Sequence, residues 1–249
     1  MKVLENKVAI ITGAGSGIGR AAAILFAKEG AKVVVSDIDE KNGKSVVNEI
    51  VKAGGEAFFI LSDSSKAEGH QSLVDDTLKK YGALDIAVNN AGIGGPIAMT
   101  GEYPLDGWQK VIDINLSGVF YGLRYQIPAM LKKGGSIVNV ASILGQAGTK
   151  GSPAYVAAKH GVVGLTKAAA LEYADQNIRI NSIGPGYVKT PLLTNTLDDE
   201  TMQGLVSLHP IGRLGESEEI AELILWLASS KSSFVTGSYY PADGGYLAQ

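Results

Sequence analysis

Residues 8–20 read VAIITGAGSGIGR, an apolar run that passes directly into a glycine-rich segment. The run Val8–Thr12 has the length and β-branched content of a buried strand, and helical periodicity follows at once. Gly13, Gly17 and Gly19 permit a tight turn that brings backbone N–H groups and the positive end of a helix toward a pyrophosphate. The spacing differs from the common G-x-G-x-x-G pattern, so a plain strand-to-helix turn is an alternative at this stage.

Short β-branched runs followed by longer helical stretches continue along the whole chain. This alternation is typical of parallel βαβ units, and near-continuous apolar strands are covered on both faces. We therefore predict an α/β fold with a doubly wound parallel sheet of about seven strands and helices on both faces. The predicted strands are 8–12, 32–37, 56–61, 84–89, 135–140, 178–183 and 238–241. The predicted helices are 18–29, 40–53, 66–81, 106–132, 153–174 and 216–228.

Composition excludes several classes of protein. The chain has 249 residues, a net charge of −3 and no cysteine, which excludes disulfides, thiolate metal sites and cysteine nucleophiles. A net charge this close to zero gives no basic field for a phosphate backbone, so we expect no nucleic-acid partner. The three histidines lack metal-ligand spacing, and no metal is expected. No apolar stretch reaches about eighteen residues, so we expect no membrane partner and a cytoplasmic location.

Nothing in the sequence marks an internal domain boundary, and we predict one NAD-binding catalytic domain over residues 1–249. Residues 184–214 form the one long stretch without clear periodicity. They contain three prolines and a glycine that favour turns, namely Pro185, Gly186, Pro191 and Pro210. Loops of this length in a compact domain are usually functional, so we interpret this stretch as a substrate lid.

An acidic residue after the glycine turn indicates the cofactor. Asp37 ends the second predicted strand twenty positions after Gly17, where a carboxylate can accept hydrogen bonds from an adenosine ribose and repel a 2′-phosphate. Ser16 and Ile38 flank it without supplying a cation, which favours NAD over NADP. A turn or helix cap is the alternative for Asp37, and Asp63 is placed either to meet the adenine edge or to cap a helix.

Several polar residues converge on one crevice of the predicted sheet. Tyr155 and Lys159 lie four residues apart and therefore share a helix face. Ser142 and the run Asn89-Asn90-Ala91-Gly92 follow strands at their carboxyl ends, the edge where open α/β sheets bind ligands. Asn115 interrupts an apolar helix, where its side chain ordinarily disfavours helical structure. A phenol beside an ammonium group is a tunable acid or base.

With these motifs in order along nearly its whole length, the chain resembles the short-chain dehydrogenase/reductase family. The matching motifs are Thr12-Gly13-x-x-x-Gly17-x-Gly19, Asn89-Asn90-Ala91-Gly92, Asn115, Ser142, Tyr155-x-x-x-Lys159 and Pro185-Gly186 with Val188 and Thr190. The resemblance implies a Rossmann-type fold and hydride transfer between a nicotinamide and a carbonyl or secondary alcohol.

The resemblance also implies roles for the catalytic residues. Tyr155 would protonate the carbonyl oxygen, or take the alcohol proton in reverse, and Ser142 would hydrogen-bond that oxygen. Lys159 would hold the nicotinamide ribose and lower the pKa of Tyr155, while Asn115 would anchor a water that links Lys159 to solvent. The expected cofactor-binding residues are Gly13, Ser16, Gly17, Ile18, Gly19, Asp37, Asp63, Ser64, Asn90, Ala91, Gly92, Tyr155, Lys159, Pro185, Gly186, Val188 and Thr190.

These features favour an NAD(H)-dependent alcohol dehydrogenase or carbonyl reductase. The residues expected around the nicotinamide, such as Ile143, Leu144 and Leu205, are apolar, which indicates a small hydrophobic ketone or secondary alcohol. A 3-oxoacyl-thioester reductase and a sugar dehydrogenase are alternatives, although Asp37 argues against the NADPH that the first would normally use. A non-catalytic nucleotide-binding regulator is the alternative from another class, and it would be expected to have lost Ser142, Tyr155 or Lys159.

The predicted helix 153–174 is apolar around nearly its whole circumference. Only one face can lie on the sheet, so a symmetric homo-oligomer would cover another face. The family resemblance suggests a homotetramer.

Overall fold

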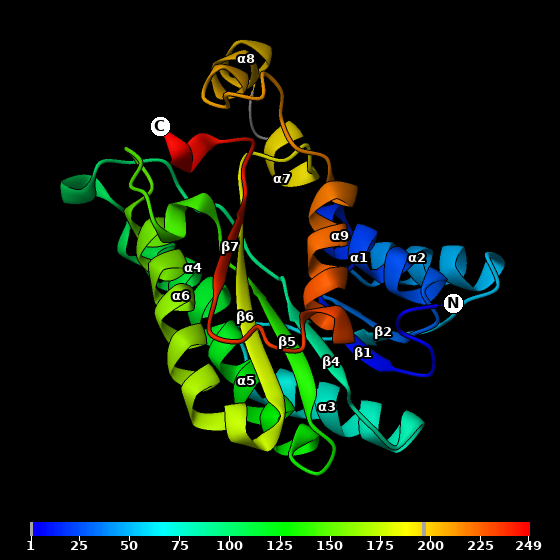
Figure 1. The fold of residues 1–249 in the computed structure, drawn as a ribbon. Helices are drawn as coiled ribbons and strands as arrows, with labels where there is room; N and C mark the ends of the chain where they lie inside the picture. Colours follow the sequence, from blue (N-terminus) through cyan, green and yellow to red (C-terminus); the bar gives the residue numbers. More distant parts are fainter. Residues whose placement is uncertain (1, 196–197) are drawn as a thin grey trace.

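The computed structural model describes residues 2–195 and 198–249, and a parallel sheet of seven strands runs through this part of the chain (Figure 1). The strands are β1 (Val8–Thr12), β2 (Lys32–Asp37), β3 (Glu56–Leu61), β4 (Ile86–Asn89), β5 (Gly135–Val140), β6 (Ile178–Pro185) and β7 (Tyr239–Ala242). Their order across the sheet is β3-β2-β1-β4-β5-β6-β7, and each neighbouring pair is parallel. The order reverses between β1 and β4, which is where a doubly wound sheet opens a crevice for ligands.

Helices cover both faces of the sheet. One face carries α1 (Gly17–Lys28), α2 (Glu40–Lys52) and α9 (Ser217–Ala228), and the other carries α3 (Ala67–Tyr81), α4 (Leu105–Ile112), α5 (Gly118–Met130) and α6 (Pro153–Tyr173) (Figure 1). A separate buried cluster lies on each side, with Phe26 and Ile224 in the first and Leu73, Ile127 and Val162 in the second. The predicted doubly wound α/β fold is confirmed.

The predicted helix 106–132 is helical from Leu105 to Met130, but a π-helical turn interrupts its regular hydrogen-bond pattern. The structure divides it into α4, a π-helical turn at Asp113–Ser117, and α5. Asn115 lies in the π-turn, and its side chain bonds in both directions to the backbone of Ile93: Oδ1 accepts from the Ile93 N–H and Nδ2 donates to the Ile93 carbonyl, each at 2.8 Å. These bonds fix the helix to the loop after β4. A π-turn inserts one extra residue into a helix and often occurs at functional sites.

The stretch 184–214 is more regular than its sequence predicts. β6 continues to Pro185, and two short helices follow, α7 (Pro191–Thr194) and α8 (Asp199–Ser207). Pro191 occupies the first helical position of α7, where its missing N–H costs nothing, and Asp198 caps α8 by accepting from the Thr201 N–H at 2.9 Å. Both helices lie above the carboxyl ends of the strands, together with the C-terminal segment (Figure 1).

A buried chain of amides ties the central strands to the helices below this edge. Asn89 donates to Gln126 and to Asn139, Gln126 donates back to Asn89, and Asn139 donates to Thr166, all at 2.8–3.1 Å. All four side chains are nearly inaccessible to solvent. The network joins β4, β5, α5 and α6, so it fixes the position of the ends of β4 and β5 relative to α6.

None of the helices within residues 2–195 and 198–249 combines the length and apolar character that spanning a membrane requires.

Candidate active site

The glycine turn and Asp37 meet at the carboxyl ends of β1 and β2. Asp37 accepts from the Gly15 N–H at 2.8 Å and from the Asp39 N–H at 2.9 Å. The helix-cap alternative for Asp37 is wrong, because Asp39 caps α2 by accepting from the Asn42 N–H. A Cβ at Gly15 would lie 2.8 Å from Asp37 Oδ2, so the close approach requires glycine. Asp37 therefore faces the turn that opens α1.

The residues after β4 are bound to the glycine turn. Asn90 donates its side-chain amide to the carbonyls of Thr12 and Gly13, at 2.9 and 3.1 Å. The backbone N–H groups of Asn90 and Ala91 both donate to the Thr12 hydroxyl. Gly13 has φ +63° and would bring a Cβ to 2.9 Å from Ala91 Cα. Gly92 lies against the Asn115 amide, so one run connects the turn to the π-helical segment.

The loop after β3 lies beside Asp37. Asp63 accepts from the Ser65 N–H at 2.9 Å, and the residue at the N-cap of α3 is Lys66, so Asp63 caps a turn rather than the helix. Ser62 donates its backbone N–H to the Asp37 carbonyl, which holds this loop next to β2. The carbonyl of Ser64 lies 3.3 Å from His70 Nε2. Asp63 and Ser64 are thus brought to the same edge as Asp37.

Ser142, Tyr155 and Lys159 come together at the end of β5. Ser142 begins the short turn that follows the strand, and its hydroxyl accepts from the Leu144 N–H at 3.1 Å. The Ser142 hydroxyl lies near the Tyr155 phenol and acts to lower its pKa. Lys159, one turn further along α6, is buried, donates to the Val140 carbonyl at 2.8 Å, and places Nζ 5.5 Å from the centre of the Tyr155 ring. The predicted serine, tyrosine and lysine therefore form one cluster.

Burial sets the protonation of this cluster. Desolvation raises the pKa of Tyr155 to about 12, the hydrogen bond with Ser142 opposes that rise, and the phenol of Tyr187 adds to it. Desolvation lowers the pKa of Lys159 to about 8. The pKa of Tyr155 is therefore raised, whereas the sequence analysis expected Lys159 to lower it. The loss of water around the phenol outweighs other effects, and the ammonium group is directed at the Val140 carbonyl.

The start of the lid approaches the glycine turn. Pro185 ends β6, and Gly186 donates its N–H to the Ala242 carbonyl at 3.0 Å. Val188 forms an isolated parallel bridge with Gly215, and Thr190 packs so close to Gly17 that a Cβ there would lie 3.1 Å from its methyl group. Thr190 thus connects the segment after β6 to the glycine turn after β1. Ser16, Ile18 and Gly19 belong to the turn and first residues of α1.

Sequence reasoning missed two contacts at this edge. Tyr239 donates its hydroxyl to the Ser142 carbonyl at 2.8 Å, although the two residues are 97 positions apart. His209 accepts from the Tyr187 N–H at 3.1 Å. The isolated Gly184 was a usable signal for the first contact, because a side chain at that position would overlap the Tyr239 hydroxyl.

Comparison with known proteins decides the family. Residues 13–247 match the family model described as enoyl-(acyl carrier protein) reductase. Cyclohexanol dehydrogenase of Acinetobacter sp. (strain SE19) is 51% identical over 246 residues, covering 98% of this chain and 96% of the relative. The chain belongs to the short-chain dehydrogenase/reductase family. This short-chain dehydrogenase/reductase is an enzyme that interconverts alcohols and ketones, and its family uses NAD or NADP.

Two further comparisons agree. The 2,5-dichloro-2,5-cyclohexadiene-1,4-diol dehydrogenase of Sphingobium indicum is 44% identical, and the alignment covers 100% of both chains. The crystal structure of a short-chain type dehydrogenase/reductase from Mycobacterium marinum superposes with a TM-score of 0.95 at 36% identity, covering 99% of this chain and 97% of that one. The short-chain dehydrogenase/reductase fold therefore extends over nearly the whole chain.

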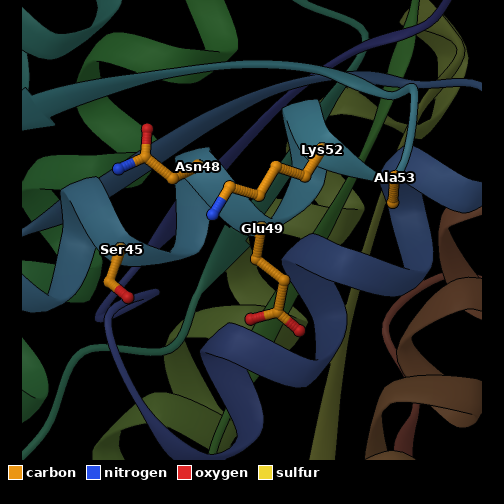
Figure 2. Close-up of a pocket in the computed structure, with 5 residues that line it drawn as sticks. All are labelled: Ser45, Asn48, Glu49, Lys52 and Ala53. Atoms are coloured by element: carbon orange, nitrogen blue, oxygen red, sulfur yellow. The ribbon is translucent and has the colours of Figure 1, made fainter.

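A surface depression on α2 is separate from the catalytic cluster. Figure 2 shows its lining of Ser45, Asn48, Glu49, Lys52 and Ala53. Glu49 extends toward α1, where it pairs with Arg20 at 2.6 Å. In Figure 1, α2 and α6 lie on opposite sides of the sheet. This depression therefore has no direct contact with the Tyr155 cluster.

Proposed function

We propose that this short-chain dehydrogenase/reductase is an NAD(H)-dependent dehydrogenase of cyclic secondary alcohols, which it interconverts with the corresponding ketones. The observation that carries the proposal is the 51% identity, over 98% of the chain, to a protein named cyclohexanol dehydrogenase. The apolar surroundings of the cluster support it, since Ile143 and Leu144 follow Ser142, and Ile93 and Tyr155 pack against the same buried apolar cluster. A neutral ring offers no charge or row of hydroxyls that such a lining would leave unpaired.

The residues of the crevice fit a dinucleotide. Gly13 and Gly17 have positive φ, Gly15 brings its backbone to Asp37, and the first N–H groups of α1 have no side-chain cap. Backbone donors of this kind hold a pyrophosphate, and Asp37 would accept from the adenosine ribose. The nicotinamide supplies the hydride chemistry when bound. The half-buried carboxylate disfavours a 2′-phosphate, which supports NAD(H) over NADP(H) and speaks against the acyl-thioester alternative.

We propose the following roles for the chain's own residues. Tyr155 donates its proton to the ketone oxygen during reduction and takes it back from the alcohol during oxidation. Because its pKa is raised to about 12, the phenol holds its proton at neutral pH and is ready to act as the acid. Ser142 donates a second hydrogen bond to the same oxygen, and the Lys159 ammonium stabilises the phenolate that forms. Asn115 fixes the loop at Ile93 that borders the cluster.

The test is a panel of alcohols and ketones assayed with both cofactors. Cyclohexanol and cyclohexanone should give the highest kcat/KM, ahead of open-chain alcohols, sugars and acyl thioesters, and NAD(H) should exceed NADP(H). Higher kcat/KM with an acyl thioester and NADPH would refute the proposal.

We also propose a homotetramer in the cytoplasm, built from a single catalytic domain. Leu105 on α4, Phe120 on α5 and Leu171 on α6 are large apolar side chains that are 48–87% exposed. Light scattering coupled to gel filtration tests this assembly, and a monomer would contradict it.

A further inference from the structure

His209 is a buried imidazole that the catalytic proposal does not use. Its side chain is 4% exposed, directly after α8. Nε2 accepts from the Tyr187 N–H at 3.1 Å, and Nδ1 lies 2.9 Å from the Leu205 carbonyl oxygen. A carbonyl can only accept, so Nδ1 carries the hydrogen, and Nε2 is left as the acceptor. The two contacts therefore fix one neutral tautomer.

The imidazole joins three segments that are distant in sequence. The Tyr187 ring lies 5.7 Å from it at 80°, and the Tyr246 ring of the C-terminal segment lies 5.8 Å from it. The two tyrosine rings are themselves 6.1 Å apart, edge to face. A Cβ at Gly186 would lie 2.7 Å from Nε2, so this approach requires glycine there. Tyr187 is thus held through its backbone by one hydrogen bond and through its ring by two aromatic contacts.

Tyr187 lies at the sheet edge that holds the proposed acid. It follows β6, which pairs with β5, the strand that leads into Ser142, and its phenol adds to the rise in the pKa of Tyr155. Tyr187 also lines a cavity of about 200 Å³, together with His209, Ile211 and Asp243 among others. This cavity gives the Tyr187 ring room to move unless its position is fixed.

We propose that His209 is a positioning residue that fixes Tyr187 as a wall of the ketone site and thereby limits the size of substrate that the site accepts. Without the Nε2 acceptor, the partly buried N–H of Tyr187 lacks a partner, and the ring shifts into the cavity that it lines. The proposal deepens the proposed function and rests on it for the choice of cyclic ketones.

Two amide variants separate the hydrogen bonds of His209. In His209→Gln, the side chain is long enough to offer an oxygen to the Tyr187 N–H. In His209→Asn, the shorter amide can still donate to the Leu205 carbonyl but does not reach Tyr187. Both variants lose the aromatic ring, so the loss of the ring cancels when they are compared. What then differs is whether the Tyr187 N–H keeps an acceptor. His160→Asn is the matched control, because His160 also contacts the carbonyl four residues earlier but is exposed.

The readout is the ratio of kcat/KM for cyclohexanone to that for the bicyclic 2-decalone, together with the NADH dissociation constant. Loss of the acceptor for the Tyr187 N–H should shift the equilibrium between the fixed and the displaced position of the ring by about 5- to 150-fold. We therefore expect His209→Asn to lower the ratio at least about fivefold, through a higher KM for cyclohexanone. His209→Gln should restore it to within about twofold of the wild type, by the same reasoning that one acceptor is regained. NADH binding and the His160→Asn variant should be unchanged. If His209 had only a structural role, kcat/KM would instead change by the same factor for both ketones.

The proposal is overturned if His209→Asn keeps the wild-type ratio, or if both amide variants change it equally. Should His209→Asn be insoluble, His209→Phe decides, since it keeps an aromatic ring beside Tyr187 and Tyr246 but removes the acceptor of the Tyr187 N–H. Its ratio should fall as well, and an unchanged ratio overturns the proposal. A wild-type preference for open-chain ketones would refute the cyclic substrate instead. The same comparison with 2-butanone and 5-nonanone then still decides the role of His209.

Discussion

The hydroxyl of Tyr239 on β7 donates a 2.8 Å hydrogen bond to the carbonyl oxygen of Ser142, the residue whose side chain meets Tyr155. This bond ties the last strand to the turn that holds the serine. Tyr239→Phe should therefore lower kcat several-fold while the unfolding free energy falls by about 1 kcal/mol, since the carbonyl keeps its other donor, the Gly145 N–H.

The neighbouring Tyr240 provides the control for that variant. It alternates to the other side of β7 and packs edge to face on Trp226 at 5.6 Å, away from Ser142. Tyr240→Phe should keep the wild-type kcat. Equal kcat values for the two variants would show that the Ser142 carbonyl bond does not affect catalysis.

Tyr155→Phe removes the transferable proton and keeps the ring in place. General acid catalysis contributes about 10²–10⁴-fold, so kcat should fall by at least about a hundredfold. NADH binding, followed by fluorescence titration, should stay within about twofold, because the ring still packs against the buried cluster that includes Val111 and Ala158. If the variant kept more than about a tenth of the wild-type activity, another group would have to be the acid on this catalytic scale.

Lys159 makes the stability of the enzyme depend on pH. Its pKa is lowered to about 8 in the folded chain, so the unfolded chain binds its proton more tightly. Below pH 8 Lys159 is protonated in both the folded and the unfolded chain, so the full cost of burying its charge lowers the free energy of unfolding. Between pH 8 and about 10.5 only the folded chain loses the proton, and the free energy of unfolding therefore rises with pH. Lys159→Met should therefore raise the unfolding free energy at pH 7 by about 2–3 kcal/mol.

Urea unfolding of wild type and Lys159→Met at pH 7 and pH 10 checks this. The stability advantage of the variant should be largest at pH 7 and mostly gone at pH 10, while turnover is lost at both. A variant less stable than wild type at pH 7 would mean that the hydrogen bond to Val140 outweighs the desolvation of the ammonium group.

Local signals predicted the fold and most of the cluster. The strand before Gly13, the turn itself and the i, i+4 pair Tyr155 and Lys159 all depend on residues close in sequence, and the structure places them as expected. The parallel order brings Ser142 and Asn90 to one edge because strand ends in a doubly wound sheet face the same way.

Contacts between distant segments account for what the sequence did not predict. The π-turn depends on the bond between Asn115 and Ile93, and helical periodicity carries no record of that partner. Likewise, prolines in 184–214 suggested an irregular lid, whereas Pro191 begins a helix once Thr190 packs on Gly17. The positions of Tyr239 and His209 depend on contacts with segments 97 and 22 residues away.

Thr166 tests the buried amide network. Its hydroxyl donates to the Val162 carbonyl and accepts from Asn139, whereas Thr77 donates to the Leu73 carbonyl at the same 2.7 Å and is equally buried. Thr166→Val leaves the Asn139 amide unpaired, so it should destabilise the protein by about 1–3 kcal/mol more than Thr77→Val does. Urea denaturation of both variants measures the difference. Equal losses would mean that Asn139 finds another acceptor.

Asp37 decides the choice of cofactor if its carboxylate, already bonded to Gly15 and Asp39, accepts from the ribose. Asp37→Ala combined with Ile38→Arg removes the repulsion of a 2′-phosphate and adds a cation that can bind it; Ile38 is 69% exposed at this edge, so arginine fits there. The kcat/KM ratio of NADH to NADPH should fall by at least about a hundredfold, as expected for charged groups worth about 1.5–3 kcal/mol each. Asp39→Ala is the matched control: it removes an adjacent carboxylate that caps α2, so it should cost about 0.5–2 kcal/mol of stability and leave the cofactor ratio unchanged. A wild type that prefers NADPH, or an Asp39→Ala variant that shifts the ratio as far as the Asp37 variant, would remove Asp37 as the determinant.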